Sequence, residues 1–300
     1  MIKKGYMFIL LTAVISGVSI FVNKFGVERI NPYLFTWAKN IVVVLLLFSL
    51  LILFKEIKTF KTLTNKQWLK LIAIGLLGGS IPFLLFFKGL AMSPSSTAAL
   101  LHKSMFIFVS ALAVLFLKEK LNKGFIVAAV LLFAGNLFLL NTVSLSFGTA
   151  ELLILIAVLL WSCETIISKN ALKELPSNVV AFGRMFFGAI FILIFLLATG
   201  NIGQFLELTV PQLGWILLTS VFLLLYVTTW YAGLKYTPAS VAASILVLGS
   251  AITTTLSLAY AGSFNITEII GIVLISSGVI IAISYSYTIS KLKILLPSKN

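Results

Sequence analysis

The chain has 300 residues, of which 60% are hydrophobic and only 10% are charged. Soluble domains carry about 25% charged residues, so this composition excludes a water-soluble protein and indicates one that spans a membrane. The formal net charge of +14 does not indicate nucleic-acid binding, because the basic residues lie between apolar runs and leave no soluble domain to bind a nucleic acid.

Ten apolar runs follow one another along the chain, each close to the roughly 20 residues that a helix needs to cross a bilayer. The sequence therefore predicts an all-α integral membrane protein with ten transmembrane helices. These cover residues 5–23, 33–54, 69–92, 95–117, 124–141, 148–168, 178–199, 211–234, 239–261 and 266–287. Gly75, Gly78, Gly79 and Pro82 allow the third of these helices to bend.

Basic residues gather in every second connection between these runs. Most of the 22 lysines and arginines lie near the termini or in the second, fourth, sixth and eighth connections. They are Lys3, Lys4, Lys55, Lys58, Lys61, Lys66, Lys70, Lys118, Lys120, Lys123, Lys169, Lys173, Lys235, Lys291, Lys293 and Lys299. Because cytoplasmic loops carry an excess of Lys and Arg, both termini are predicted to be cytoplasmic. Lys24 and Arg29 in the first connection are the exception.

A segment of eleven residues occurs twice. Gly89–Ala99 and Gly233–Ala243 are identical at six positions, start 144 residues apart, and each joins two apolar runs through a Ser/Thr-Pro pair. Five spans per half is an odd number, so the second half enters the membrane from the opposite side. We predict an inverted repeat, with five-helix units at 1–143 and 144–290 and a cytoplasmic tail at 291–300. Such repeats are typical of alternating-access transporters.

Several short motifs recur in a characteristic order over nearly the whole chain. They are Ser93-Pro94, Lys118-Glu119-Lys120-Leu121, Gly135, Trp161-Ser162, Arg184, Thr237-Pro238 and Gly278. With the ten spans and the duplication, they resemble the drug/metabolite transporter superfamily, specifically its EamA-type members. The resemblance implies a transporter that exports amino acids, nucleosides, sugars, drugs or other metabolites.

Two ionisable residues lie at similar depth in neighbouring spans. An ionisable side chain in a span costs a few kcal/mol, so Glu164 and Arg184 each need a partner or a function. One interpretation is a structural ion pair, and the other is a gate or a pair that contacts substrate. Both interpretations are compatible with each other.

The first half carries cations without a matching acid. Lys39 corresponds to Arg184 in the repeat, and Lys103 and His102 lie in the fourth span. We expect Lys39 and Lys103 to give an outer vestibule a positive potential that attracts an anionic or carboxylate-bearing solute, although lysines also bind helix carbonyls. Lys24, nearer the interface, is expected to snorkel. His102 is either a hydrogen-bonded packing residue or a proton relay together with Glu164.

Three aromatic residues complete the candidate substrate-binding set. Trp161 shares a helix face with Glu164, and Trp230 and Tyr231 correspond to a Phe-Phe pair in the first half. They are predicted to line the substrate path, while anchoring at the lipid interface is the competing account. The full set is Lys39, His102, Lys103, Trp161, Glu164, Arg184, Trp230 and Tyr231.

The sequence predicts a secondary transporter of the cell membrane that exports a small metabolite, an amino acid or a related organic solute, by alternating access. The alternatives are a drug, nucleoside or sugar permease of the same fold, and then a channel or a membrane enzyme. No catalytic arrangement or phosphate-binding motif is present, so we expect no enzyme and no cofactor. A single histidine makes a His-rich metal site impossible. The expected partners are a small-molecule substrate and the lipid bilayer, with the chain as either a monomer or a homodimer.

Overall fold

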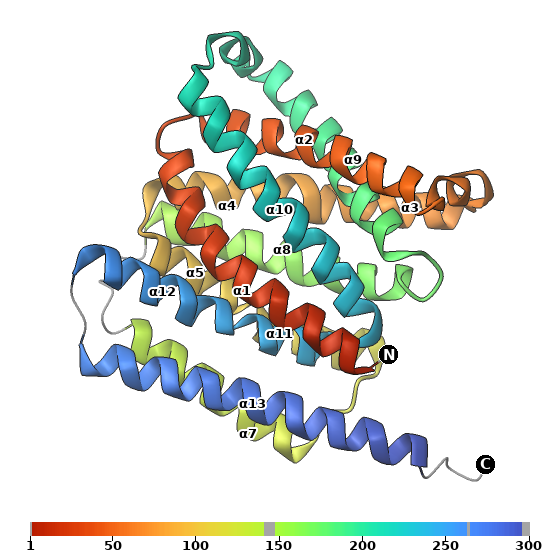
Figure 1. The fold of residues 1–300 in the computed structure, drawn as a ribbon, viewed down its shortest axis with the longest axis vertical. Helices are drawn as coiled ribbons and strands as arrows, with labels where there is room; N and C mark the ends of the chain where they lie inside the picture. The colour runs from red at the N-terminus through yellow and green to blue at the C-terminus, as the bar shows by residue number, and fades with distance from the viewer. Residues whose placement is uncertain (1, 141–147, 263–264, 296–300) are drawn as a thin grey trace.

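A computed structural model describes residues 2–140, 148–262 and 265–295, with the backbone alone at 2, 140 and 288–295. Three sequence predictions fall outside these residues: the end of the fifth span at 141, the boundary between the two units at 143 and 144, and part of the tail at 291–300. Within the described residues the chain is a bundle of helices that run roughly side by side (Figure 1).

All ten predicted spans are helical. The first half consists of α1 (Ile2–Val27), α2 (Pro32–Leu53), α3 (Asn65–Ile74), α4 (Ile81–Met92), α5 (Ser95–Lys103), α6 (Met105–Leu117) and α7 (Lys123–Leu140). The second half consists of α8 (Thr149–Ala171), α9 (Ser177–Ala198), α10 (Val210–Tyr236), α11 (Ala239–Leu246), α12 (Leu248–Ala261) and α13 (Ile266–Leu295). Two 3-10 helices, Glu56–Thr62 and Asn201–Glu207, lie in connections. In the described residues nine spans are long and apolar enough to cross a membrane, and Lys123–Leu139 is a shorter apolar one.

Three spans are interrupted. The third span joins α3 to α4 through a π-helical segment, Gly75–Ser80, where the glycines predicted a bend. The fourth span breaks at Ser104, between α5 and α6, and the ninth at Val247, between α11 and α12. Because the fourth and ninth spans occupy the same place in their halves, these two breaks are features of the repeat.

Paired glycine contacts show the inverted repeat directly. A Cβ atom on Gly89 of α4 would lie 2.6 Å from Cγ1 of Ile154 on α8, and one on Gly233 of α10 would lie 2.5 Å from Cδ1 of Ile9 on α1. Gly233 follows Gly89 by 144 residues and Ile154 follows Ile9 by 145. The same contact is therefore made twice, each time between a helix of one half and a helix of the other.

The two ends of the bundle are distinguished by contacts between distant segments. Tyr6, early in α1, and Ser286, late in α13, are joined by a hydrogen bond of 2.7 Å; we call this the termini end. At the opposite end Asn31 Nδ2 donates to Gln204 Oε1 over 3.0 Å. The connections that hold most of the basic residues lie at the termini end, where Lys70 also pairs with Glu174 over 2.9 Å. Hydrogen bonds from Lys70 and Gln67 lower the pKa of the Glu174 carboxyl group.

Each Ser/Thr-Pro hairpin is held by a lysine from the first helix of its own half, α1 or α8. The last carbonyls of a helix lack intrahelical partners and attract cations. At the opposite end Lys24 donates to the carbonyls of Leu90, over 3.0 Å, and of Ala91. At the termini end Lys169 donates to the carbonyls of Leu234, over 2.6 Å, and of two neighbouring residues. Lys24, which is expected to snorkel, thus also caps a helix end, and it pairs with the exposed Glu28 over 2.8 Å.

The termini-end hairpin has a second contact. Both carboxylate oxygens of Glu119 accept hydrogen bonds from backbone N–H groups at the start of α11, from Ala239 over 2.7 Å and from Ser240 over 3.1 Å. The preceding residue, Lys118, has a left-handed backbone conformation, with φ 56°. Its counterpart in the second half is Gly262, at φ 70°.

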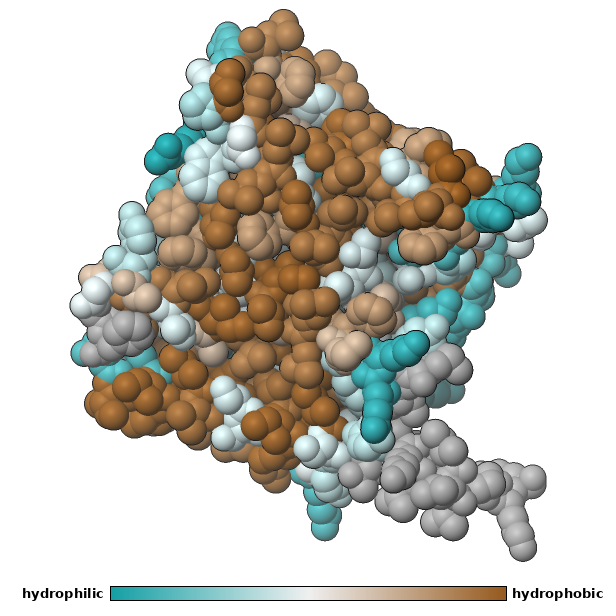
Figure 2. Space-filling view, viewed as in Figure 1, coloured by the Kyte–Doolittle hydropathy of each residue, from teal (hydrophilic) through white to brown (hydrophobic). Residues whose placement is uncertain are grey.

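The outer surface of the bundle is apolar. Figure 2 shows a continuous hydrophobic face between edges that carry the polar residues. Large apolar side chains are exposed along many helices, among them Leu45, Leu53, Leu115, Phe116, Val130 and Ile194. A surface of this kind matches the hydrocarbon core of a bilayer, so the chain is a multi-pass membrane protein.

Close helix contact at Gly135 can be tested against a matched glycine. A Cβ atom on Gly135 of α7 would lie 2.7 Å from Cγ1 of Ile275 and 2.9 Å from the carbonyl oxygen of Gly271, both on α13. Gly135→Ala should therefore destabilise the protein by about 1–3 kcal/mol through overpacking. Gly214 of α10 has nothing within 4 Å of its Cβ position, so Gly214→Ala should stabilise it by about 0.5–1 kcal/mol. Thermal midpoints in one detergent would measure both, and equal shifts would contradict the packing.

Candidate functional site

A cavity lies between the two halves of the bundle. Its lining comes from α1, α2, α4, α5 and α6 of the first half and α8, α9 and α10 of the second. The lining residues are Ser16, Ser19, Ile20, Asn23, Lys39, Phe83, Phe86, Phe87, His102, Met105, Trp161, Glu164, Thr165, Arg184, Leu223, Tyr226 and Trp230. Its volume is about 60 Å³, and its lining is mostly apolar with several polar and charged side chains among it.

The structure brings the eight candidate residues together around this cavity. Six line it, namely Lys39, His102, Trp161, Glu164, Arg184 and Trp230. The other two, Lys103 and Tyr231, lie behind the lining and bond to residues that form it. Their roles in binding substrate stay predictions.

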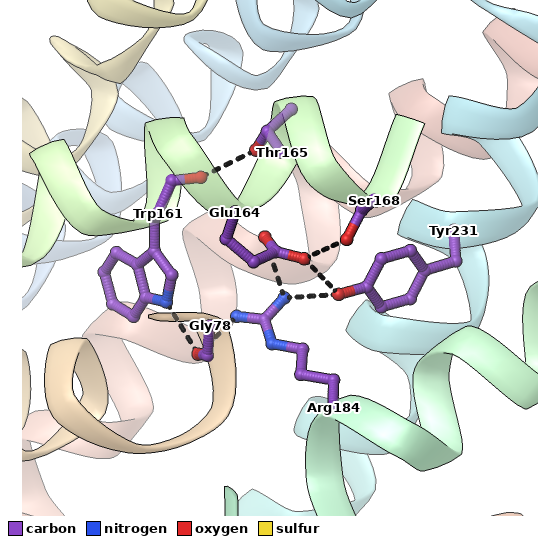
Figure 3. A network of polar contacts seen from close by, with 7 residues as sticks. All are labelled: Gly78, Trp161, Glu164, Thr165, Ser168, Arg184 and Tyr231. Atoms are coloured by element: carbon purple, nitrogen blue, oxygen red, sulfur yellow. Dashed lines mark hydrogen bonds and ion pairs between the residues drawn. The ribbon is translucent and has the colours of Figure 1, made fainter. Parts of the chain in front are cut away.

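Glu164 and Arg184 form the polar centre of the second half (Figure 3). Arg184 Nη1 lies 3.9 Å from Glu164 Oε2, and both side chains are almost fully buried. Glu164 Oε1 accepts hydrogen bonds from the Tyr231 hydroxyl, over 2.6 Å, and from Ser168. Arg184 Nη1 donates to the Tyr231 oxygen over 3.3 Å. The expected ion pair is thus part of a network from α8, α9 and α10.

The other side of the network is a backbone carbonyl in the broken third span. The carbonyl oxygen of Gly78 accepts from Trp161 Nε1 over 2.9 Å and from Arg184 Nη2 over 3.0 Å. In a regular α-helix this carbonyl would accept from residue 82, but Pro82 has no N–H to donate. The absence of a side chain at Gly78 also lets Glu164 pack closely against it, since a Cβ atom at Gly78 would lie 2.6 Å from Cγ of Glu164.

Lys39 forms a second cationic centre in the first half. Its side chain is 1% exposed, and its Nζ donates to Asn23 Oδ1. The same Nζ lies 4.3 Å from the ring centre of Phe87 and 4.7 Å from that of Phe35. Among the described residues no carboxylate lies within ion-pair distance of Lys39.

The two cationic centres correspond through the repeat. Arg184 follows Lys39 by 145 residues, and each cation faces an aromatic ring at matching positions, Phe87 for Lys39 and Tyr231 for Arg184. The two centres differ in that only the one in the second half contains an acidic residue, Glu164. Glu164 in the second half is replaced by Ser19 in the first, whose hydroxyl accepts from Asn23 over 2.9 Å.

Lys103 and His102 lie on α5, just before its break. Lys103 Nζ donates to Ser16 Oγ over 2.6 Å and lies 3.3 Å from His102 Nδ1. The His102 ring lies 4.9 Å from that of Trp161 and 5.3 Å from that of Phe86. His102 is thus both packed against rings and directed at the cavity, so the geometry leaves both interpretations of it open.

The two candidate tryptophans are inside the protein. Trp161 is 5% exposed and Trp230 is 1% exposed, and Trp230 stacks on Tyr226 with ring centres 6.4 Å apart. Anchoring at the lipid interface requires exposure, so the competing account of these residues does not hold.

Sequence reasoning missed part of the lining. Ser16, Ser19, Asn23 and Thr165 supply polar groups to the cavity, and the Gly78 carbonyl joins two candidate residues. Ser19 could have been found as the repeat counterpart of Glu164. The freed carbonyl could have been found from Pro82, four residues after Gly78. Within the described residues no group of three or more His, Cys, Asp or Glu could hold a metal ion.

The architecture is an all-helical membrane bundle of two repeated halves around a cavity that carries charged side chains. The chain belongs to the EamA-like transporter family, whose profile matches residues 3–141 and again 148–284. Membership indicates transport rather than catalysis.

Relatives agree with this assignment. An uncharacterized transporter of Clostridium kluyveri is 28% identical over 97% of this chain and 96% of its own length. An uncharacterized transporter of Synechocystis sp. is 24% identical over 60% of this chain and 55% of its own length. A solved crystal structure has the same fold, with a TM-score of 0.71, 18% identity, and coverage of 94% of this chain and 97% of the other.

The buried pair can be measured by a double-mutant cycle on Glu164→Gln and Arg184→Gln. Arg184→Gln should cost about 3–5 kcal/mol, because it leaves a buried carboxylate without its cation. The double variant should be more stable than the sum of the single effects predicts, by about 0.5–3 kcal/mol. Glu174→Gln combined with Arg184→Gln is the control, because Glu174 pairs with Lys70 instead, and its effects should add. Additivity in both cycles would show that Glu164 and Arg184 are not coupled.

Proposed function

We propose that this chain is a secondary transporter that moves a small carboxylate-bearing solute, an amino acid or a close relative, across the cytoplasmic membrane by alternating access. The observation that carries the proposal is the buried Lys39 centre, which faces the cavity without an acidic partner among the described residues. A charged side chain at the centre of a membrane costs about 2.5–3.5 kcal/mol even with snorkelling. A solute carboxylate would supply the missing counter-charge.

The size of the cavity supports a small solute. The available 60 Å³ exceeds the roughly 10–15 Å³ that a cavity needs to hold one water molecule. That space suits a compact amino acid better than a nucleoside or a large drug. The alternative permease for larger solutes requires the cavity to widen first.

The chemistry of the two halves suits a zwitterion. In our proposal the solute carboxylate is bound by Lys39, with Lys103 adding positive potential from behind the lining. The solute ammonium group faces the Glu164 side of the cavity, where the rings of Trp161 and Trp230 favour a cation. The two charged ends of an amino acid would thus bind different halves of the bundle.

The two hairpins at opposite ends of the bundle support our proposal of alternating access. We propose that the units at 1–143 and 144–290 rock against each other around the cavity, with the hairpin at Thr237-Pro238 closing the termini end and the one at Ser93-Pro94 closing the other. The basic connections support a cytoplasmic termini end. Export is the direction we propose, on the resemblance to exporters, and Glu164 and His102 are the candidates for proton coupling.

Transport by purified protein in liposomes tests the reaction class. Labelled amino acid should enter proteoliposomes saturably, and an internal pool of unlabelled amino acid should accelerate its entry by counterflow. A carrier exchanges solute across the membrane through one site, whereas a channel gives linear flux without counterflow. Linear flux would contradict the proposal, and so would entry at the rate of protein-free liposomes for every amino acid, nucleoside and sugar tested.

Charge selectivity tests the Lys39 centre. Lys39→Gln combined with Lys103→Gln should weaken binding of an amino acid or organic anion by at least about tenfold, because each charged hydrogen bond contributes about 1.5–3 kcal/mol. Binding of a neutral analogue should change much less. Lys88→Gln is the matched control, since Lys88 is a half-buried lysine of α4 outside the cavity lining. Competition binding measures all three, and equal losses for neutral and anionic ligands would count against a carboxylate site.

A further inference from the structure

An apolar groove lies at the termini end, separate from the central cavity. It has a volume of about 270 Å³, and its lining has no polar surface. The end of α2, the 3-10 helix Glu56–Thr62, α3 and α9 supply its walls. The lining includes Phe48, Ile57, Phe60, Trp68, Phe182 and Phe186. Most of these are aromatic rings in contact, such as Phe182 and Phe186, which stack with ring centres 5.3 Å apart.

Three lysines lie within two residues of groove residues along the chain. Side chains three residues apart share one face of a 3-10 helix, so Ile57 and Phe60 form its groove face and Lys58 and Lys61 form the adjacent face. Lys66 lies in the first turn of α3, the helix that also carries Trp68. All three lysines are exposed. We call Lys58, Lys61 and Lys66 the lysine row.

The charge of this row is not neutralised by the protein. Among the described residues no carboxylate lies within ion-pair distance of Lys58, Lys61 or Lys66. The acids in the neighbouring segments are engaged elsewhere. Glu174 accepts from Lys70 over 2.9 Å, and Glu56 accepts from Asn178 over 3.0 Å.

We propose that the groove and the lysine row form a binding site for an anionic phospholipid. One acyl chain lies in the aromatic groove, and the phosphate group is bound by the lysine row. The occupant is argued from charge complementarity, because an apolar groove bordered by cations at the end of a span matches a chain attached to an anion. A zwitterionic lipid would offer the same chain with its phosphate charge cancelled.

A second copy of the chain fits this surface less well. In a two-fold dimer the same patch of each subunit meets its copy, so two lysine rows would be brought into one interface. Like charges held together in this way repel each other, and the nearby acids Glu56 and Glu174 already bond to Asn178 and Lys70. An anionic lipid meets the same row with the opposite sign of charge.

Native mass spectrometry of the full chain in detergent can measure the preference. The purified protein is incubated with equal amounts of dioleoyl phosphatidylglycerol and dioleoyl phosphatidylcholine, and the ratio of bound lipids is read from the protein–lipid peaks. The wild type should retain phosphatidylglycerol over phosphatidylcholine. Each lysine near anionic lipid contributes about fivefold in affinity, so K58Q/K61Q/K66Q should reduce the preference at least about tenfold.

Two further variants separate this site from general electrostatics. K118Q/K120Q/K123Q removes three exposed lysines from another connection at the same end, and should leave the preference within about twofold of wild type, since these residues lie outside the groove. Ile57→Asn makes the groove wall polar at a position that is 37% exposed. It should lower occupancy by both lipids while the thermal midpoint stays close to that of the wild type.

The outcomes decide the proposal. Loss of phosphatidylglycerol preference in K58Q/K61Q/K66Q but not in K118Q/K120Q/K123Q supports it. An unchanged preference in the first variant, or an equal loss in both, overturns it. If Ile57→Asn changes the mass of the assembly from dimer to monomer without changing lipid occupancy, the groove is an interface between copies and the lipid site is refuted.

Discussion

A backbone carbonyl whose α-helical donor is missing organises the centre of this protein. Within a bilayer every carbonyl must find its hydrogen bond inside the protein, and Pro82 removes the N–H that would serve Gly78. Trp161 and Arg184 satisfy that oxygen instead. Arg184 in turn brings Glu164 and Tyr231 into the same network. The interruption of one span therefore fixes side chains from three others around the cavity.

The rest of the site follows from duplication with divergence. Both halves place a cation against an aromatic ring at corresponding positions, Lys39 on Phe87 and Arg184 on Tyr231. In the second half the cation is balanced by Glu164. In the first half the same place is taken by Ser19 and Asn23, which bond to each other. One side of the cavity is thus neutralised by the protein, and on the other no carboxylate of the described residues pairs with Lys39.

Much of this arrangement could be predicted from the sequence, and the reasons are physical. Hydrophobic runs of sufficient length are helices in a membrane, and the positions of the two hairpins gave the repeat. Glu164 and Arg184 stood out because charges in a span are costly and tend to pair. Their distance and their partners depend on how α8, α9 and α10 cross, which no local pattern records.

Other features could not be predicted from the sequence, because they depend on the local backbone conformation or on contacts between distant segments. A bend is predicted at Gly75–Ser80, and the structure has a π-helical segment there. The carbonyl oxygen of Gly78 in this segment accepts hydrogen bonds from side chains. Lys24 and Lys169 look like ordinary interfacial lysines until the ends of α4 and α10 are placed beside them. The aromatic groove joins residues from Phe48 to Phe187, whose proximity is a product of packing alone.

The left-handed residue before Glu119 affects how firmly the termini-end hairpin is held. A left-handed conformation costs roughly 1–2 kcal/mol for a residue with a side chain, and Lys118 adopts it where the other half uses Gly262. The two backbone hydrogen bonds of Glu119 contribute about 1.5–3 kcal/mol each as charge-assisted bonds. Part of that stabilisation is offset by strain one residue away, so the contact holds the hairpin less firmly than its two hydrogen bonds alone would.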